Sequence, residues 1–272
     1  MQNFLNFLIK KINSFSLRIE KRVRFVVSAF VLSLLLLIST FFFFDKAIFF
    51  IPLFILVTYL LTYFSVLEGI DKSEWIMLFL IPVIFSVAFY LFYFLFPVRW
   101  LTRLPFIVIY AVAIYAILLT SNIFNVGVEK SLQLFRAAFS VNYFFQTIII
   151  FLIANILFSA RENFMINAAL VGASVFPVSL QLYWTIKLNL KLERDLFLYA
   201  FLTAFVLAQI VMVLSFIPFK PSIMALVVTA SYYSLSGLIT AFIDTRLFKQ
   251  TVREYIILLG IVVVIALLTI NW

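Results

Sequence analysis

The chain has 272 residues, of which 66% are hydrophobic and 11% charged, whereas soluble domains carry roughly 45–50% apolar and about 25% charged residues. This composition excludes an ordinary soluble domain and predicts an all-α, polytopic helix bundle in a lipid bilayer. The net charge of +9 fits basic loops beside anionic lipid, so we expect no nucleic-acid partner. The chain contains neither cysteine nor histidine, so disulfides, iron–sulfur ligation and the usual zinc sites are excluded, and we expect no metal and no cofactor.

The first 22 residues have apolar side chains at helical spacing, with basic and amide side chains filling most of the positions between them. This pattern predicts an amphipathic helix over 1–22 that lies on the cytoplasmic surface of the membrane. The helix could instead dock a partner protein. A cleavable signal peptide is rejected, because the charged region is too long and no small-residue cleavage site follows. The apolar positions are Phe4, Leu8, Ile12, Phe15 and Ile19.

Residues 23–272 are predicted to form a single transmembrane bundle. A helix needs about 20 apolar residues to cross a bilayer, and charged residues fall almost entirely between the segments that meet this condition. The nine predicted spans are 25–44, 47–66, 75–97, 105–126, 137–159, 164–186, 196–217, 222–243 and 255–271.

The distribution of basic residues predicts the orientation of the spans in the cell membrane. With the N-terminus in the cytoplasm and the C-terminus outside, 15 of the 20 Lys and Arg residues fall in cytoplasmic segments and 5 in outer segments. Removal of the fifth span, which has a polar start, changes this division to 11 against 9. Because cytoplasmic loops are enriched in Lys and Arg, the nine-span topology explains the sequence better.

The connection between the fourth and fifth spans is harder to assign. Asn122, Asn125 and Gly127 interrupt the end of the fourth span, and a charged, partly amphipathic stretch follows to Phe139. A helix along the inner membrane interface and a re-entrant segment both fit this pattern, and the sequence does not choose between them.

Three carboxylates gather in the segment LEGIDKSEW, residues 67–75. Asp71 and Glu74 have the spacing of a capping box directly before an apolar run, and their charge suits the N-terminal end of the third span. Glu68 has no such structural role. It is therefore a speculative contact for lipid head groups or anions, together with Arg99 and Arg103 beside Trp100.

A polar seam runs through spans five to eight. We define it by the residues that are speculative substrate contacts: Asn142, Gln146, Gln181, Gln209 and Ser234. The seam could bind a head group or small solute, but interhelical hydrogen bonding is the favoured interpretation because polar residues facing neighbouring helices are routine. Small residues four apart in the sixth and eighth spans, such as Ala168 with Gly172 and Gly237 with Ala241, predict that these two spans lie inside the bundle; the first span is expected to face lipid.

None of the nine predicted spans has an ionisable residue in its middle, which disfavours proton relays and ion-coupled transport. Nucleotide-binding and hydrolase motifs are also missing, so no catalytic residue is assigned and an enzyme is not expected. The leading hypothesis is a non-enzymatic scaffold or accessory subunit of a membrane assembly, with a membrane-protein partner or a homo-oligomer both open. The alternatives are a transporter or lipid-handling protein that uses the polar seam, and a membrane enzyme on lipid-linked substrates that uses Glu68 and Asp71.

Overall fold

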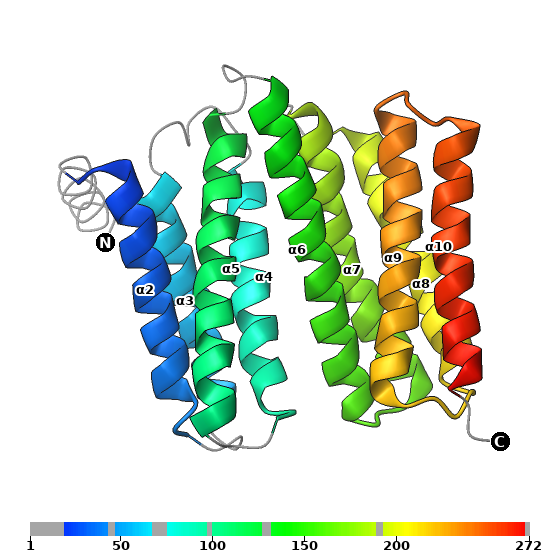
Figure 1. Ribbon diagram of the computed structural model, residues 1–272, viewed down its shortest axis with the longest axis horizontal. Coiled ribbons are helices and arrows are strands. Elements are labelled where there is room, and N and C mark those ends of the chain that lie inside the picture. Colours follow the sequence, from blue (N-terminus) through cyan, green and yellow to red (C-terminus); the bar gives the residue numbers. More distant parts are fainter. Residues whose placement is uncertain are drawn as a thin grey trace. The chain divides into compact units, whose positions relative to one another are not determined.

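The computed structural model describes residues 19–42, 47–66, 75–96, 100–126, 132–188 and 193–269. Within these ranges it contains nine helices that are long and apolar enough to cross a membrane, which confirms the predicted helical membrane bundle (Figure 1). Most of the predicted amphipathic helix over 1–22 lies outside the described residues. The helices are α2 (Lys21–Ser39), α3 (Ala47–Val66), α4 (Trp75–Tyr93), α5 (Trp100–Val126), α6 (Leu132–Ser159), α7 (Phe164–Lys187), α8 (Arg194–Leu214), α9 (Pro221–Ile243) and α10 (Lys249–Leu268).

Several helices begin about one turn before the predicted spans, because they continue through charged residues. Arg103, Arg136 and Arg253 lie within the first two turns of α5, α6 and α10, although the predicted spans begin after them. Long basic side chains are tolerated there because they can extend from a helix end toward the polar interface. The same effect corrects the expectation of a separate interfacial or re-entrant segment before Phe139: residues 132–139 are the opening turns of α6.

The chain divides into two compact units, residues 1–141 and 142–272, with the boundary inside α6. In the first unit α2 packs against α3 and α5, and α4 packs against the same two helices (Figure 1). The predicted lipid-facing character of α2 holds for one side only. Its Phe25, Leu32 and Leu36 are buried, whereas Val26 and Phe30 on the opposite side are exposed.

Aromatic side chains fill much of the interior of the first unit. Phe54 of α3 stacks on Tyr90 of α4 with ring centroids 4.8 Å apart, and Phe85 of α4 stacks on Tyr110 of α5 at 5.9 Å. The Tyr110 hydroxyl donates to Ser86 Oγ at 2.8 Å, so its polar end is satisfied inside the bundle. Part of the phenylalanine and tyrosine content of the chain therefore packs helices together instead of facing lipid.

A buried arginine in this unit joins the start of α2 to the end of α3. Arg24, in the first turn of α2, is only 1% exposed, and its Nη1 lies 3.5 Å from the Phe64 carbonyl of α3. One turn later, Ser28 Oγ donates to the Leu61 carbonyl at 3.3 Å and accepts from Ser65 Oγ at 2.8 Å. A basic residue that lies just before the first predicted span is thus part of a polar contact between two helices.

The second unit contains the remainder of α6 and helices α7 to α10. α7 packs along α8, and α9 contacts α7, α8 and α10. A Cβ atom added at Gly172 of α7 would lie 3.4 Å from Ala208 Cβ of α8, so the small residue permits this close approach. In the apolar 18-residue stretches of α7 and α9, 50% of the residues are buried, against 33% in α8. This agrees with the predicted interior position of α7 and α9.

Candidate functional site

Three helices of the second unit are joined by a buried hydrogen-bond network, which we call the polar network: Asn142 and Gln146 on α6, Gln181 on α7 and Tyr232 on α9. Gln181 Oε1 accepts from Asn142 Nδ2 at 3.0 Å and also from Gln146 Nε2. The Tyr232 hydroxyl in turn donates to Gln146 Oε1 at 2.9 Å. The sequence pattern placed three of these residues in one seam, and the fold brings those three into direct contact.

The geometry of the polar network favours a structural role. Asn142, Gln146, Gln181 and Tyr232 are all buried, and three hydrogen bonds connect them into one continuous chain. Lipid offers no hydrogen bonds, so polar groups inside a membrane protein are stabilised by partners on neighbouring helices. A solute that entered here would have to break contacts between the helices before it could bind.

The other two predicted seam residues lie elsewhere. Ser234 Oγ donates to the Tyr255 carbonyl at 3.2 Å and so connects α9 to α10. Gln209 lies on the exposed side of α8 and belongs to no hydrogen bond with the polar network. The five residues named from the sequence therefore do not form one site.

Tyrosines on α6 and α9 strengthen the same helix contacts, and of these the sequence interpretation did not name Tyr143. The Tyr143 hydroxyl donates to the Tyr233 carbonyl and lies 3.2 Å from Ser236 Oγ, and the Tyr143 and Tyr233 rings stack with centroids 5.0 Å apart. Tyr232 completes the polar network as described above. The clustering of tyrosine and serine at residues 231–236 was visible in the sequence, but which helix each side chain faces was not.

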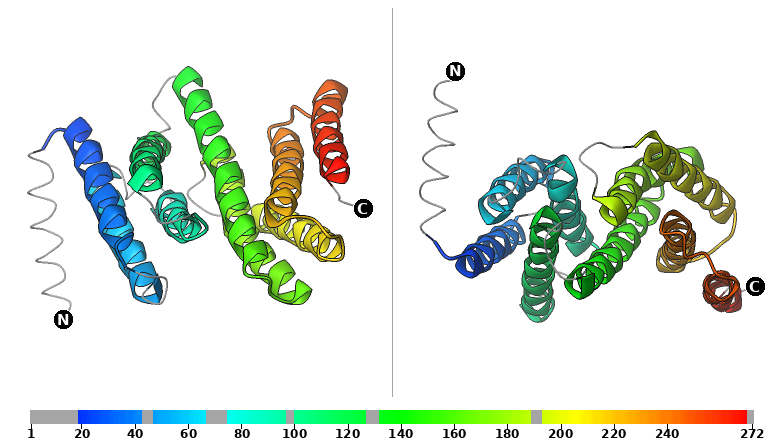
Figure 2. Two further views of the ribbon diagram at one scale, coloured as in Figure 1. Left: turned by 60° about the horizontal axis from the view of Figure 1, so that its bottom comes forward. Right: turned by 90° about the horizontal axis from the view of Figure 1, so that it is seen from above.

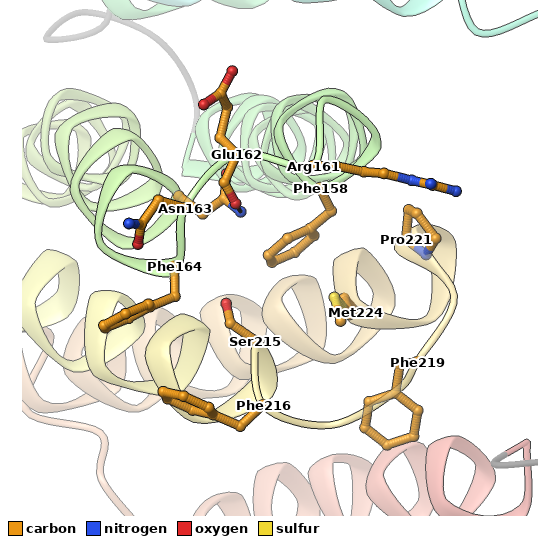
Figure 3. Close-up of a pocket in the computed structure, with 11 residues that line it drawn as sticks. Phe158, Arg161, Glu162, Asn163, Phe164, Ser215, Phe216, Phe219, Pro221 and Met224 are labelled. Carbon is orange, nitrogen blue, oxygen red and sulfur yellow. Dashed lines mark hydrogen bonds between the residues drawn. The ribbon is translucent and has the colours of Figure 1, made fainter.

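A pocket of about 570 Å³ opens at one end of the second unit, where α6 meets α7 and α8 meets α9 (Figure 3). Asn163 begins α7 there, its side chain accepting from the Met165 amide at 3.1 Å. Asn167 and Ser215 contribute polar atoms, and four phenylalanines contribute apolar surface. The lining residues are Phe158, Arg161, Glu162, Asn163, Phe164, Asn167, Ser215, Phe216, Phe219, Pro221 and Met224.

Residues 129–269, just over half of the chain, match the model of a family described as "Protein of unknown function (DUF5656)". The chain belongs to this family. The DUF5656 match covers α6 to α10, and therefore both the polar network and the pocket. No curated protein and no solved structure matches the chain.

The speculative head-group contacts lie outside the DUF5656 match, and the structure describes one of the three. Arg103 donates from Nε to the Tyr93 hydroxyl at 3.0 Å, and its guanidinium lies over the rings of Phe41 and Trp100, 4.8 and 5.5 Å from their centroids. Arg103 is thus held by aromatic neighbours. Arg99 and Glu68 fall outside the described residues, as do Asp71 and Glu74.

No group of acidic residues suited to a metal ion occurs within the described part of the chain. The described ion pairs are surface contacts: Lys187 with Glu193 at 3.0 Å, and Arg246 with Asp244 at 3.3 Å. Exposed pairs of this kind add little to stability and do not define a binding site.

Proposed function

We propose that the chain is a non-enzymatic, multi-pass membrane protein that acts as a scaffold or accessory subunit, and that it binds another integral membrane protein through α10. The observation that carries this proposal is the exposure of α10. In the apolar 18-residue stretch of α10, only 6% of the residues are buried inside the chain. In the corresponding stretches of the other eight spans, between 28% and 61% of the residues are buried. α10 lies at the edge of its unit beside α9 (Figure 2).

Glycine usage supports a helix contact on α10. The chain has five glycines, and Gly172 and Gly237 both lie where neighbouring helices approach closely. Gly260 lies midway along α10, is exposed, and would have nothing within 4 Å of an added Cβ. Glycine costs about 1 kcal/mol relative to alanine in a helix interior. Because small residues let transmembrane helices approach each other, a helix of a partner protein is a physical reason for glycine here.

Substitution at Gly260 provides a direct test, because added volume there meets no atom of the chain itself. We expect Gly260→Leu to leave the fold intact and to reduce co-purification of the partner from membranes by at least about tenfold, equivalent to about 1.4 kcal/mol. Phe201→Leu on the exposed side of α8 is the matched control, since it also changes an exposed apolar side chain.

Crosslinking identifies the neighbour in the intact membrane. The chain has no cysteine, so a single Ile261→Cys on α10 and a single Phe201→Cys on α8 can each carry a photocrosslinker. The α10 position should give a discrete product with a second protein, and the α8 position should give lipid adducts. A product of twice the chain mass would identify the partner as a second copy. Lipid adducts alone at both positions would refute the assembly role.

We further propose that the protein lies in the cell membrane with a cytoplasmic N-terminus and an external C-terminus, on the basis of the basic residues counted above. Single cysteines at Arg161 and Phe248, both exposed, should then react with membrane-impermeant maleimide on opposite sides: 161 in intact cells, and 248 only after permeabilisation. The reverse pattern would overturn this orientation.

A further inference from the structure

The pocket at the end of the second unit has the features of a binding site, and it shares no residue with the polar network. Phe158, Phe164 and Phe216 give it apolar walls (Figure 3). Its volume of about 570 Å³ falls within the range of small-molecule sites, which combine a mostly apolar lining with a few placed polar groups.

Asn167 supplies a polar group that can accept a hydrogen bond from a ligand. It is 5% exposed, and its Nδ2 donates to the Glu162 carbonyl at 3.1 Å. This bond fixes the orientation of the amide, because a carbonyl oxygen can only accept. The buried Oδ1 then has no donor among the described residues. A buried acceptor left unsatisfied costs free energy, and a hydroxyl or N–H group of a ligand would remove that cost.

Two further side chains define the polar part of the pocket. Ser215 Oγ donates to the Val211 carbonyl at 2.8 Å, so its lone pairs remain available to accept, and Figure 3 shows it pointing into the space beside Phe158. Arg161 extends along the rim beside Pro221, while Glu162 points away from the α8–α9 side. The rim thus offers a guanidinium, which suits a phosphate oxygen.

We propose that this pocket binds a phospholipid whose phosphate carries a hydroxyl-bearing head group, with glycerol as the simplest case. Asn167 Oδ1 accepts from the head-group hydroxyl, Ser215 Oγ is a second acceptor, and Arg161 contacts the phosphate. The aromatic walls pack against the glycerol backbone and the first carbons of the acyl chains. A neutral hydroxyl fits better than an ammonium group, because a buried cation would need a facing carboxylate and Glu162 points away.

Lipid pairs that differ in one group test this assignment. The purified full chain is placed in phosphatidylcholine nanodiscs that contain either phosphatidylglycerol or phosphatidylethanol, and the bound lipid is quantified by native mass spectrometry. The two lipids carry the same charge, but only the first has head-group hydroxyls. We expect phosphatidylglycerol to bind about two- to tenfold more tightly, as one net hydrogen bond provides.

Two substitutions separate head-group selection from phosphate binding. Asn167→Leu should bring the preference for phosphatidylglycerol close to one, because it removes the acceptor. Arg161→Gln should weaken both lipids by a similar factor and leave the preference unchanged. Lys249→Gln, an exposed cation at the start of α10, is the matched control and should change neither quantity.

Folding of the variants is checked by circular dichroism and gel filtration, and Ser215→Ala provides a second probe. Its side chain can be removed at little cost, since the Val211 carbonyl still accepts from the Ser215 amide at 3.0 Å. Ser215→Ala should lower the preference for phosphatidylglycerol. Equal binding of the two lipids by the unmodified chain would overturn the proposal, and so would a preference that survives Asn167→Leu. Tighter binding of free glycerol 1-phosphate than of the lipid would overturn the assignment to a lipid.

Discussion

The polar network predicts a measurable coupling between Gln146 and Gln181. Replacing either residue by Met keeps most of the side-chain volume and removes its hydrogen bonds. Gln181→Met removes the bonds from Asn142 and Gln146, and Gln146→Met removes the bonds with Gln181 and Tyr232. At about 0.6–1.7 kcal/mol per interhelical hydrogen bond in a membrane, each single substitution should lower the free energy of unfolding by about 1–3 kcal/mol.

The double variant should cost less than the two single variants added together. The Gln146–Gln181 bond is lost in both single variants but can be lost only once in the double variant. The difference should therefore be about 0.6–1.7 kcal/mol. A second effect increases this difference. In Gln181→Met the buried Gln146 Nε2 loses its acceptor, which costs free energy, but the double variant has no Gln146 side chain and does not carry that cost.

The free energies can be measured by unfolding the four proteins with sodium dodecyl sulfate in mixed micelles, followed by tryptophan fluorescence. The control cycle pairs Gln181→Met with Asn163→Ala, which removes the side-chain cap of α7. Asn163 is 18 residues from Gln181, or about 27 Å along the helix, so these changes should add to within about 0.5 kcal/mol. Additive effects of Gln146→Met and Gln181→Met would refute the hydrogen bond between them.

Two other contacts predict different outcomes for similar substitutions. A Cβ at Gly237 would overlap the ring of Tyr255, so Gly237→Ala should destabilise the second unit by about 1–3 kcal/mol in the same unfolding assay. At Gly172 the new atom would have ordinary contact distances, so Gly172→Ala should change stability by less than about 1 kcal/mol. Arg103→Leu should remove a cation–π contact worth about 0.5–2 kcal/mol and change the fluorescence of Trp100; an unchanged free energy of unfolding and an unchanged spectrum would contradict that contact.

The fold was predictable because the membrane restricts the choices. Runs of apolar residues of sufficient length must be helical in lipid, and charges delimit them. The errors arose where side-chain length or local packing overrides composition. The predicted spans began after Arg103 and Arg136, which lie in the first two turns of α5 and α6. The first predicted span likewise began after Arg24, which is buried and contacts α3.

The seam was predictable only in part, because helical spacing fixes neighbours within one helix but not the rotation of one helix against another. Asn142 and Gln146 are one turn apart, so they had to share a side of α6. Whether Gln181 or Gln209 would face them depended on how α7 and α8 turn toward the bundle, and Gln209 turned out to be exposed. The pocket was not predicted, because its lining residues come from α6, α7 and α9 and from the connections that follow α6 and α8.

The polar network and the pocket differ in whether a buried polar atom remains without a hydrogen-bond partner. This difference indicates where a ligand can be recognised. In the polar network, Gln146 and Gln181 are bonded to each other and to residues of neighbouring helices, so a change there is expected to alter stability. In the pocket, Asn167 holds one bond within the chain and retains a buried acceptor, so a change there alters what can bind. Stability should therefore respond mainly to Gln181, and lipid selectivity mainly to Asn167. A variant of Gln181 that keeps its stability yet loses lipid selectivity would contradict this division.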